Sequence, residues 1–164
     1  MKSRSIVVGV LAAWGLTAAL AGRVSANANV VVLDATRTLT PTAADYTNDY
    51  VEITGVSGVR VQVSTDPGNG LNLYVRCADA APRIALADFL VRTLTAPGTG
   101  GTTMATYTAV TAVNQLLWST ASAPAGSTTV NTDIRIKNLF AYSDPIGAGT
   151  TNYTDTLTFT VVEQ

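Results

Sequence analysis

Two runs of alternating apolar and polar residues stand near the middle of the chain: Gly58-Val59-Arg60-Val61-Gln62-Val63-Ser64 and Leu71-Asn72-Leu73-Tyr74-Val75-Arg76-Cys77. A period of two residues predicts a β-strand with one buried face, because successive side chains of a strand point to opposite faces. The apolar set of each run, including Cys77, is therefore expected in the core. The stretch between the runs, Asp66-Pro67-Gly68-Asn69-Gly70, is dense in turn residues, so the two strands are predicted to form a hairpin.

The same alternation recurs toward the C-terminus. Ile134 and Ile136 alternate with charged residues in Thr132–Lys137, and Leu157, Phe159 and Val161 alternate with threonines in Thr154–Val162. Weaker strand candidates are Val30–Leu33, Thr36–Leu39, Tyr50–Thr54, Phe89–Leu94, Thr103–Ala109 and Gln115–Ser119. A helical turn fits only Ile84–Val91 and Val110–Leu117.

Breaks that contain Gly or Pro separate many of these strands, at Thr95–Gly101, Ser122–Ser127 and Ser143–Gly149. Short alternating strands with turn signals between them are typical of an all-β sandwich or barrel. We therefore predict an all-β fold, a single antiparallel β-sandwich of about seven to nine strands, with a jelly-roll-like arrangement as the alternative. No internal repeat or long linker divides the chain.

The N-terminus has the three parts of a secretory signal peptide. Lys2 and Arg4 give a positive start, Ile6–Ala21 is a short apolar run, and Val24-Ser25-Ala26 or Ala26-Asn27-Ala28 supplies the small residues before a cleavage point. We predict a signal peptide at residues 1–26 and one β-sandwich domain at residues 27–164. The protein is then secreted, extracellular or at the cell surface, with no membrane contact once the signal is removed. A retained membrane anchor and a type IV pilin leader are the alternatives.

Composition limits the function. The 164 residues include no His and a single Cys, which excludes a Ser-His-Asp triad, a His-based zinc site and a disulfide within one chain. Without residues 1–26 the chain has seven basic and 11 acidic side chains, the opposite of a phosphate-binding balance. We predict no nucleic-acid partner, no enzyme activity, no catalytic residue, no metal and no cofactor.

Four groups of residues are candidates for a binding or reactive site. The acidic run Asp45–Glu52 is a weak candidate for Ca²⁺, and Cys77 is expected to pack as a small hydrophobic residue. Asp133 and Asp155 are a conceivable carboxylate pair, but solvated strand positions are expected for both. The aromatic residues that can form a sugar-binding platform are Tyr107, Trp118, Phe140, Tyr142 and Tyr153.

The last strand candidate suggests a family. Gly149-Thr150-Thr151-Asn152-Tyr153-Thr154-Asp155-Thr156-Leu157-Thr158-Phe159-Thr160-Val161 resembles the closing strand of spore coat protein U domains and related secreted pilin-like sandwiches. This resemblance covers about a dozen residues. It implies an Ig-like fold and, in pilus-forming relatives, assembly by donor-strand exchange. The chain departs from that family in having one Cys where paired cysteines are common.

The segment Asn29–Thr40 gives an independent reason to consider assembly. It follows the predicted signal peptide and is too apolar to remain in water, so it must pair with its own sheet or with a neighbour's. Both pairings stay open. The interface residues expected for a donor strand are Val30, Val31, Val32, Leu33 and Leu39.

We therefore predict a structural subunit of an extracellular filament, pilus or surface coat. Its partners are copies of itself, which join head to tail because repeated strand addition does not close. The alternative is a monomeric secreted or surface-attached binding module, with glycans as a candidate ligand.

Overall fold

The computed structural model describes residues 6–12, for which only the backbone is considered, and residues 28–66, 68–94, 97–124, 126–142 and 153–164. Strands account for 51% of the structure and nearly all pair in antiparallel fashion, so the chain is all-β. The strands are β1 (Ile6–Ala12), β2 (Asn29–Val32), β3 (Thr36–Leu39), β4 (Tyr50–Ile53), β5 (Val59–Ser64), β6 (Leu71–Cys77), β7 (Phe89–Arg92), β8 (Thr102–Thr103), β9 (Thr108–Ala109), β10 (Gln115–Thr120), β11 (Ser127–Lys137) and β12 (Tyr153–Glu163). One short helix, α1 (Ala43–Asn48), and the 3₁₀ turns η1 (Gly55–Ser57) and η2 (Leu139–Tyr142) complete the described elements.

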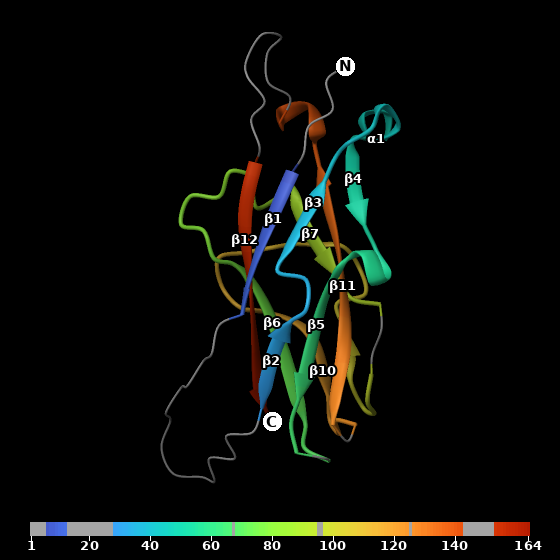
Figure 1. Cartoon of the computed structure of the whole chain (residues 1–164), viewed down its shortest axis with the longest axis vertical. Coiled ribbons are helices and arrows are strands. Elements are labelled where there is room, and N and C mark those ends of the chain that lie inside the picture. The colour runs from blue at the N-terminus through green and yellow to red at the C-terminus, as the bar shows by residue number, and fades with distance from the viewer. Residues whose placement is uncertain (1–5, 13–27, 67, 95–96, 125, 143–152) are drawn as a thin grey trace.

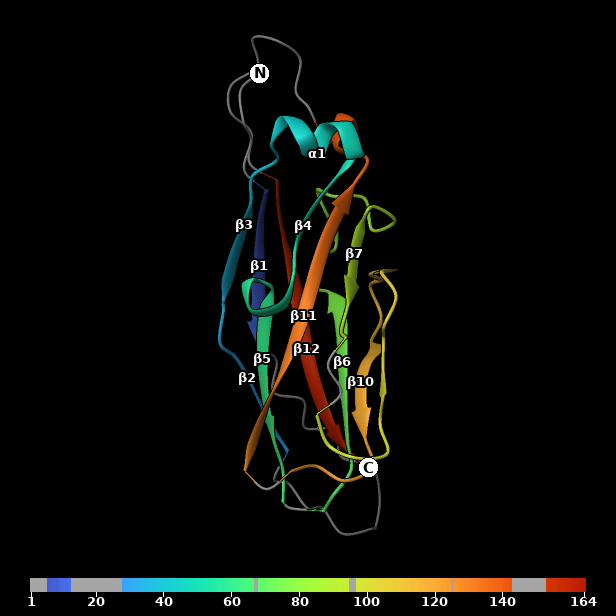
Figure 2. The ribbon, with the colours of Figure 1, turned by 90° about the vertical axis from the view of Figure 1, so that its right-hand side faces the viewer.

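The strands form two sheets. One has the order β3-β1-β12-β6-β10-β8, and the other has the order β2-β5-β11-β7-β9. The strand β4 pairs with the C-terminal part of β11, Ile134–Lys137. Figures 1 and 2 show the strands running along the long axis of the molecule, with α1 at one end. The two sheets enclose a single cluster of buried apolar side chains.

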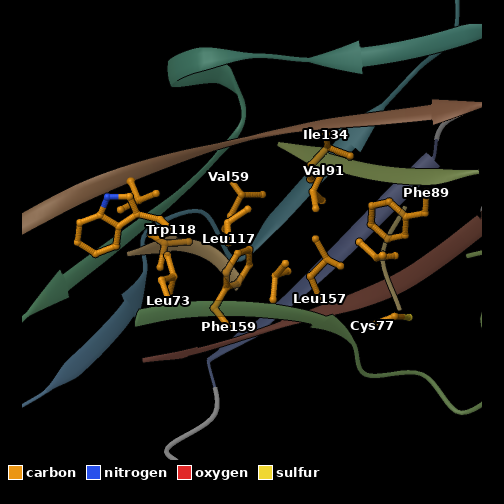
Figure 3. Packing of buried hydrophobic residues seen from close by; sticks show 14 of the residues in the cluster. Val59, Leu73, Cys77, Phe89, Val91, Leu117, Trp118, Ile134, Leu157 and Phe159 are labelled. Atoms are coloured by element: carbon orange, nitrogen blue, oxygen red, sulfur yellow. The ribbon is translucent and has the colours of Figure 1, made fainter. Parts of the chain in front are cut away.

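The core confirms the face assignments made from alternation. Eleven of the 12 residues expected inside from the four strongest runs, Cys77 included, are at most 1% exposed. Val161 is only partly buried, because it lies near the C-terminal end of β12. Figure 3 shows Val59, Val91 and Ile134 of one sheet facing Leu73, Leu157 and Phe159 of the other.

The predicted hairpin is wrong. β5 pairs with β2 and β11, whereas β6 pairs with β10 and β12, so the two runs lie in different sheets. Residues 65–70 therefore connect the two layers. Alternation determines which face of a strand is buried but not which strand lies beside it, and two strands that both turn an apolar face to the core can face each other across it.

Each of the weaker strand candidates contains strand residues. Thr103–Ala109 contains two short strands, β8 and β9, that belong to different sheets. Ile84–Val91 holds one hydrogen-bonded turn, in which the Phe89 N–H donates to the Ala85 carbonyl, before β7 begins. The described residues of Val110–Leu117 form no helix.

The helix α1 lies where only an acidic run was noticed. The Thr42 hydroxyl accepts from the Asp45 backbone N–H, and the Asp45 carboxylate accepts from the Thr42 backbone N–H at 2.7 Å. This capping box satisfies two donors that a helix otherwise leaves unpaired at its start. Asp49 ends the helix in the left-handed conformation, with φ 59°. The Thr-x-x-Asp spacing was the signal available in the sequence.

Candidate functional site

The strand β1 lies inside a sheet, between β12 and the edge strand β3 (Figure 1). It pairs with β12 in parallel over its whole length, from Ile6 opposite Tyr153 to Ala12 opposite Phe159. On its other side it pairs antiparallel with β3, from Ile6 opposite Leu39 to Gly9 opposite Thr36. Among the strands that the structure describes, β1 and β12 are the one parallel pair.

This placement matters because β1 lies wholly inside the segment predicted to be a signal peptide. We call its position the β1 slot, whose walls are Tyr153–Phe159 of β12 and Thr36–Leu39 of β3. Leu39, Leu157 and Phe159 of these walls are buried in the core. A chain without residues 1–26 keeps the residues of both walls, but the backbone groups that β1 satisfies lose their partner. Because β1 is the one partner of β3 among the described strands, β3 is then paired with no strand.

The segment Asn29–Thr40 pairs within its own chain in this structure. Val30, Val31 and Val32 lie in β2 and pair with Val63, Gln62 and Val61 of β5. Val30 is buried and Val32 packs against the core, whereas Val31 and Leu33 are 40% and 42% exposed. Leu39 lies in β3 and is buried, so it belongs to a wall of the β1 slot. The structure contains a single chain, and the expected donation to a neighbour stays a prediction.

A charged cluster fastens the junction of β2 and β3. Asp34 accepts from Arg60 Nε at 2.8 Å, from Arg60 Nη2 at 3.1 Å and from the Arg60 backbone N–H at 3.0 Å. Arg37 adds an ion pair to the same carboxylate at 2.8 Å, and its Nε donates to the Gly58 carbonyl. The hydrogen bond from the Arg60 side chain, aided by the charge of Arg37, lowers the pKa of Asp34 to about 2.

The Asp34 cluster is not apparent in the sequence. Asp34 and Arg37 stand three residues apart, but Arg60 is 26 residues further along than Asp34. An acid between two apolar runs was the signal that could have drawn attention to it. Without the β2–β5 register, the sequence offers no reason to choose Arg60 as its partner.

Asp133 and Asp155 are not solvated, and that expectation is wrong. Asp133 is 3% exposed, because the Gly55 N–H donates to it at 2.7 Å and Arg92 Nε at 2.8 Å. Asp155 is 1% exposed and accepts from two backbone N–H groups of the loop before β7, each at 2.7 Å. Burial raises the pKa of Asp155. Asp133 lies on the outward face of β11, where Gly55 of η1 covers it, whereas Asp155 lies on the same face of β12 as the buried Leu157 and Phe159. The two carboxylates lie in different sheets.

The acidic run Asp45–Glu52 separates into unrelated roles. Asp45 caps α1, Asp49 ends it, and Glu52 lies in β4, where it binds Arg135 at 2.6 Å. Among the described residues no group of three or more His, Cys, Asp or Glu side chains is placed to hold a metal ion. The structure thus offers nothing that favours the calcium reading.

The five aromatic residues do not form one platform. Trp118 is in the core, Tyr142 and Tyr153 pack edge to face with ring centroids 5.4 Å apart, and Phe140 packs against Tyr46. The remaining aromatic residue, Tyr107, contributes to a separate cluster.

Tyr107 lies under two guanidinium groups, Arg92 at 4.2 Å and Arg135 at 4.0 Å from the ring centroid. Its hydroxyl donates to Glu52 at 2.9 Å. Burial, together with this hydrogen bond, raises the pKa of Tyr107. Each arginine also binds a carboxylate, Asp133 or Glu52, so the cluster is internally paired and fastens the segment before β9 to β4, β7 and β11.

Cys77 lies on the inward side of β6, as its alternation predicts, and is 1% exposed. Burial raises the pKa of its thiol, which disfavours the reactive thiolate. Within the described part of the chain, no helix has the length and apolar character needed to cross a membrane.

Comparison with known proteins gives no further guide. No protein-family model matches the sequence, and neither the search of curated proteins nor that of solved structures found a match. The function is therefore argued from the β1 slot and the residues around it.

Proposed function

We propose that this protein is a structural subunit of an extracellular filament, pilus or surface coat. In this proposal residues 1–26 are a cleaved signal peptide, and the rest folds as an Ig-like β-sandwich that lacks one strand. A strand from a neighbouring copy fills the β1 slot, and repetition of this contact builds the assembly. The resemblance of the C-terminal strand to spore coat protein U domains points the same way.

The observation that carries the proposal is the position of β1. A segment predicted to be removed occupies an interior position of a sheet, next to the edge strand β3, where it pairs with β12 and β3 at once. Its removal leaves two unpaired strand edges above a core that contains Leu157 and Phe159. Unpaired edges beside exposed apolar surface favour the addition of a strand.

The candidate donor is the stretch Asn29–Leu33. In its own chain β2 is an edge strand, and β5 is its one partner among the described strands. In the β1 slot of a neighbour the same residues would pair on two sides. The exchange leaves one edge of β5 unpaired, but it pairs the donor with both β12 and β3 of the neighbour. More backbone groups therefore find partners in the assembly than in the isolated subunit.

The Asp34 cluster sets the limit of the donated segment. Arg60 and Arg37 hold Asp34 in its own subunit, and β3 is needed as a wall of the slot. The strand that moves therefore ends at Leu33, and Leu39, although part of the segment first predicted to donate, serves the receiving side. This division explains how one continuous segment can serve two neighbours.

The test is the assembly state of the chain 27–164. Light scattering and negative-stain images should show fibres or growing oligomers whose size rises with protein concentration. Val32→Asp should abolish them, because a charge at a position that packs against a core is costly to bury. Val31→Asp is the matched control, since Val31 is 40% exposed.

Chemical denaturation of both variants separates loss of assembly from loss of folding. If Val32→Asp still unfolds cooperatively and remains a monomer, donation by this strand is supported. A wild-type chain 27–164 that is monodisperse at about 14 kDa, at about 0.1 kDa per residue, and at every concentration, would refute assembly. That result would favour the alternative, a monomeric binding module.

A further inference from the structure

We propose that Ile6–Ala12 is a placeholder strand: before cleavage it fills the β1 slot of its own chain and excludes a donor from another molecule. The inference rests on the proposed function, in which this slot is the docking site. The inference gives Ile6–Ala12 a regulatory role. Export alone would require only that this segment be apolar. Removal of the leader then becomes the step that makes a subunit competent to assemble.

The pairing of β1 is that of a structural strand. Each of its seven residues has a partner in β12, and its first four residues also have partners in β3. The register sets Ile6, Val8, Val10 and Ala12 opposite Tyr153, Asp155, Leu157 and Phe159. These four residues of β12 belong to the alternate set whose members Asp155, Leu157 and Phe159 are buried. Leu39, the β3 partner of Ile6, is buried as well.

The predicted cleavage points suit a removable strand. They follow Ala26 or Ala28 and thus fall between β1, which ends at Ala12, and β2, which begins at Asn29. A single cut there breaks the covalent link of β1 to the fold and leaves the other pairings intact.

The covalent tether explains why the placeholder strand blocks assembly only before cleavage. A segment tethered to its own slot acts at an effective concentration of the order of millimolar. A donor on another molecule at about micromolar concentration is then at a disadvantage of roughly a thousandfold. After cleavage this advantage disappears, and the donor competes with a free peptide that dilution removes.

The experiment compares two cysteine pairs in the uncleaved chain, made by translation without membranes, with Cys77→Ala in every variant. Val7→Cys with Thr38→Cys joins residues that are direct partners in the β1–β3 ladder. Val7→Cys with Thr36→Cys is the matched control, two residues out of register on the same strand. Direct partners have Cβ atoms about 4.5–5.5 Å apart and diagonal ones about 7–8 Å, so only the first pair approaches disulfide geometry.

We expect the direct pair to oxidise at least about tenfold faster than the control. A second direct pair, Val7→Cys with Thr154→Cys, tests the β12 wall independently. The cross-linked chain should remain monomeric and should not bind a labelled peptide of residues 27–35, whereas the chain 27–164 binds it. The inference would be overturned if, in a folded chain, both direct pairs failed to cross-link or cross-linked no faster than the control pair. Assembly of the cross-linked chain would also overturn it.

The two proposals can fail separately. Cross-linking in register together with a chain 27–164 that never assembles would leave β1 as a strand of the precursor but refute the filament. Assembly of 27–164 without cross-linking of the uncleaved chain would support the filament and refute the placeholder.

Discussion

Single residues on β12 show how this sequence builds a core. Leu157 and Phe159 are fully buried, while the threonines that alternate with them face the other side of the sheet. On that side Thr154 is exposed, Thr156 and Thr160 are partly exposed, and Thr158 is buried. Thr is β-branched and favours a strand, and its hydroxyl remains compatible with water. The chain has 26 Thr and only 13% charged residues, so its outward faces are built from hydroxyl groups more than from ion pairs.

Phe159→Ala should destabilise the full-length chain by about 3–5 kcal/mol, because the ring is fully buried and its loss leaves a cavity. Val162→Ala, on the same strand but 43% exposed, is the matched control and should change the free energy of unfolding by less than about 0.5 kcal/mol. Urea denaturation measures both. Equal effects would mean that the inward face of β12 is wrongly assigned.

Asp34 should make stability depend on acid pH. Its pKa is about 2 in the folded chain and 3.8 without partners. The depressed pKa means that its contribution is complete above pH 4 and is lost as the pH falls toward 2. Asp34→Asn should lower the free energy of unfolding at pH 7 by about 1.5–3 kcal/mol, the range for hydrogen bonds to charged groups.

The control for Asp34 is the shape of the pH profile. Denaturation curves between pH 7 and pH 2 should fall less steeply for Asp34→Asn than for the wild type at the acid end. Parallel profiles for the two proteins would show that the carboxylate is not held by Arg60 and Arg37 in solution.

At the scale of elements, the sequence predicts strands and their buried faces but not their neighbours. The alternation of Val59, Val61 and Val63 placed those side chains correctly, yet the same pattern suggested a false hairpin with β6. Partner choice depends on contacts between distant segments, such as β5 with β11, which carry no local signal. The burial of Asp133 has no local signal either, since Gly55, which covers it, lies far away in the chain. Asp155 does have one, because it alternates in register with Leu157 and Phe159.

The helix α1 has a local signal and should respond locally. Thr42→Ala removes the side chain that accepts from Asp45 and should cost about 1 kcal/mol. Thr42→Ser keeps the hydroxyl and should restore most of that stability. Thermal unfolding of the two variants measures the difference; if both lose the same amount, the capping box does not form.

At the scale of the whole molecule, the position of β1 could not be foreseen. Its apolar run was predicted as an export signal, and nothing local in Ile6–Ala12 distinguishes a signal peptide from a buried strand. The two interpretations are compatible. Ile6–Ala12 can serve as an export signal before cleavage, and the fold lacks the strand β1 after cleavage. The chain without residues 1–26 is therefore expected to have an unfilled slot between β12 and β3.

The most direct measurement is the melting temperature of the chain 27–164 with a peptide of residues 4–13 added in trans. The Val32→Asp variant serves as the host, because it should not donate its own strand. The melting temperature should rise with peptide concentration, corresponding to about 2.7 kcal/mol at a hundredfold excess over the dissociation constant. A peptide carrying Val10→Asp, opposite the buried Leu157, should have no effect. A folded, monodisperse host whose melting temperature is unchanged at every concentration of the unmodified peptide would contradict the account.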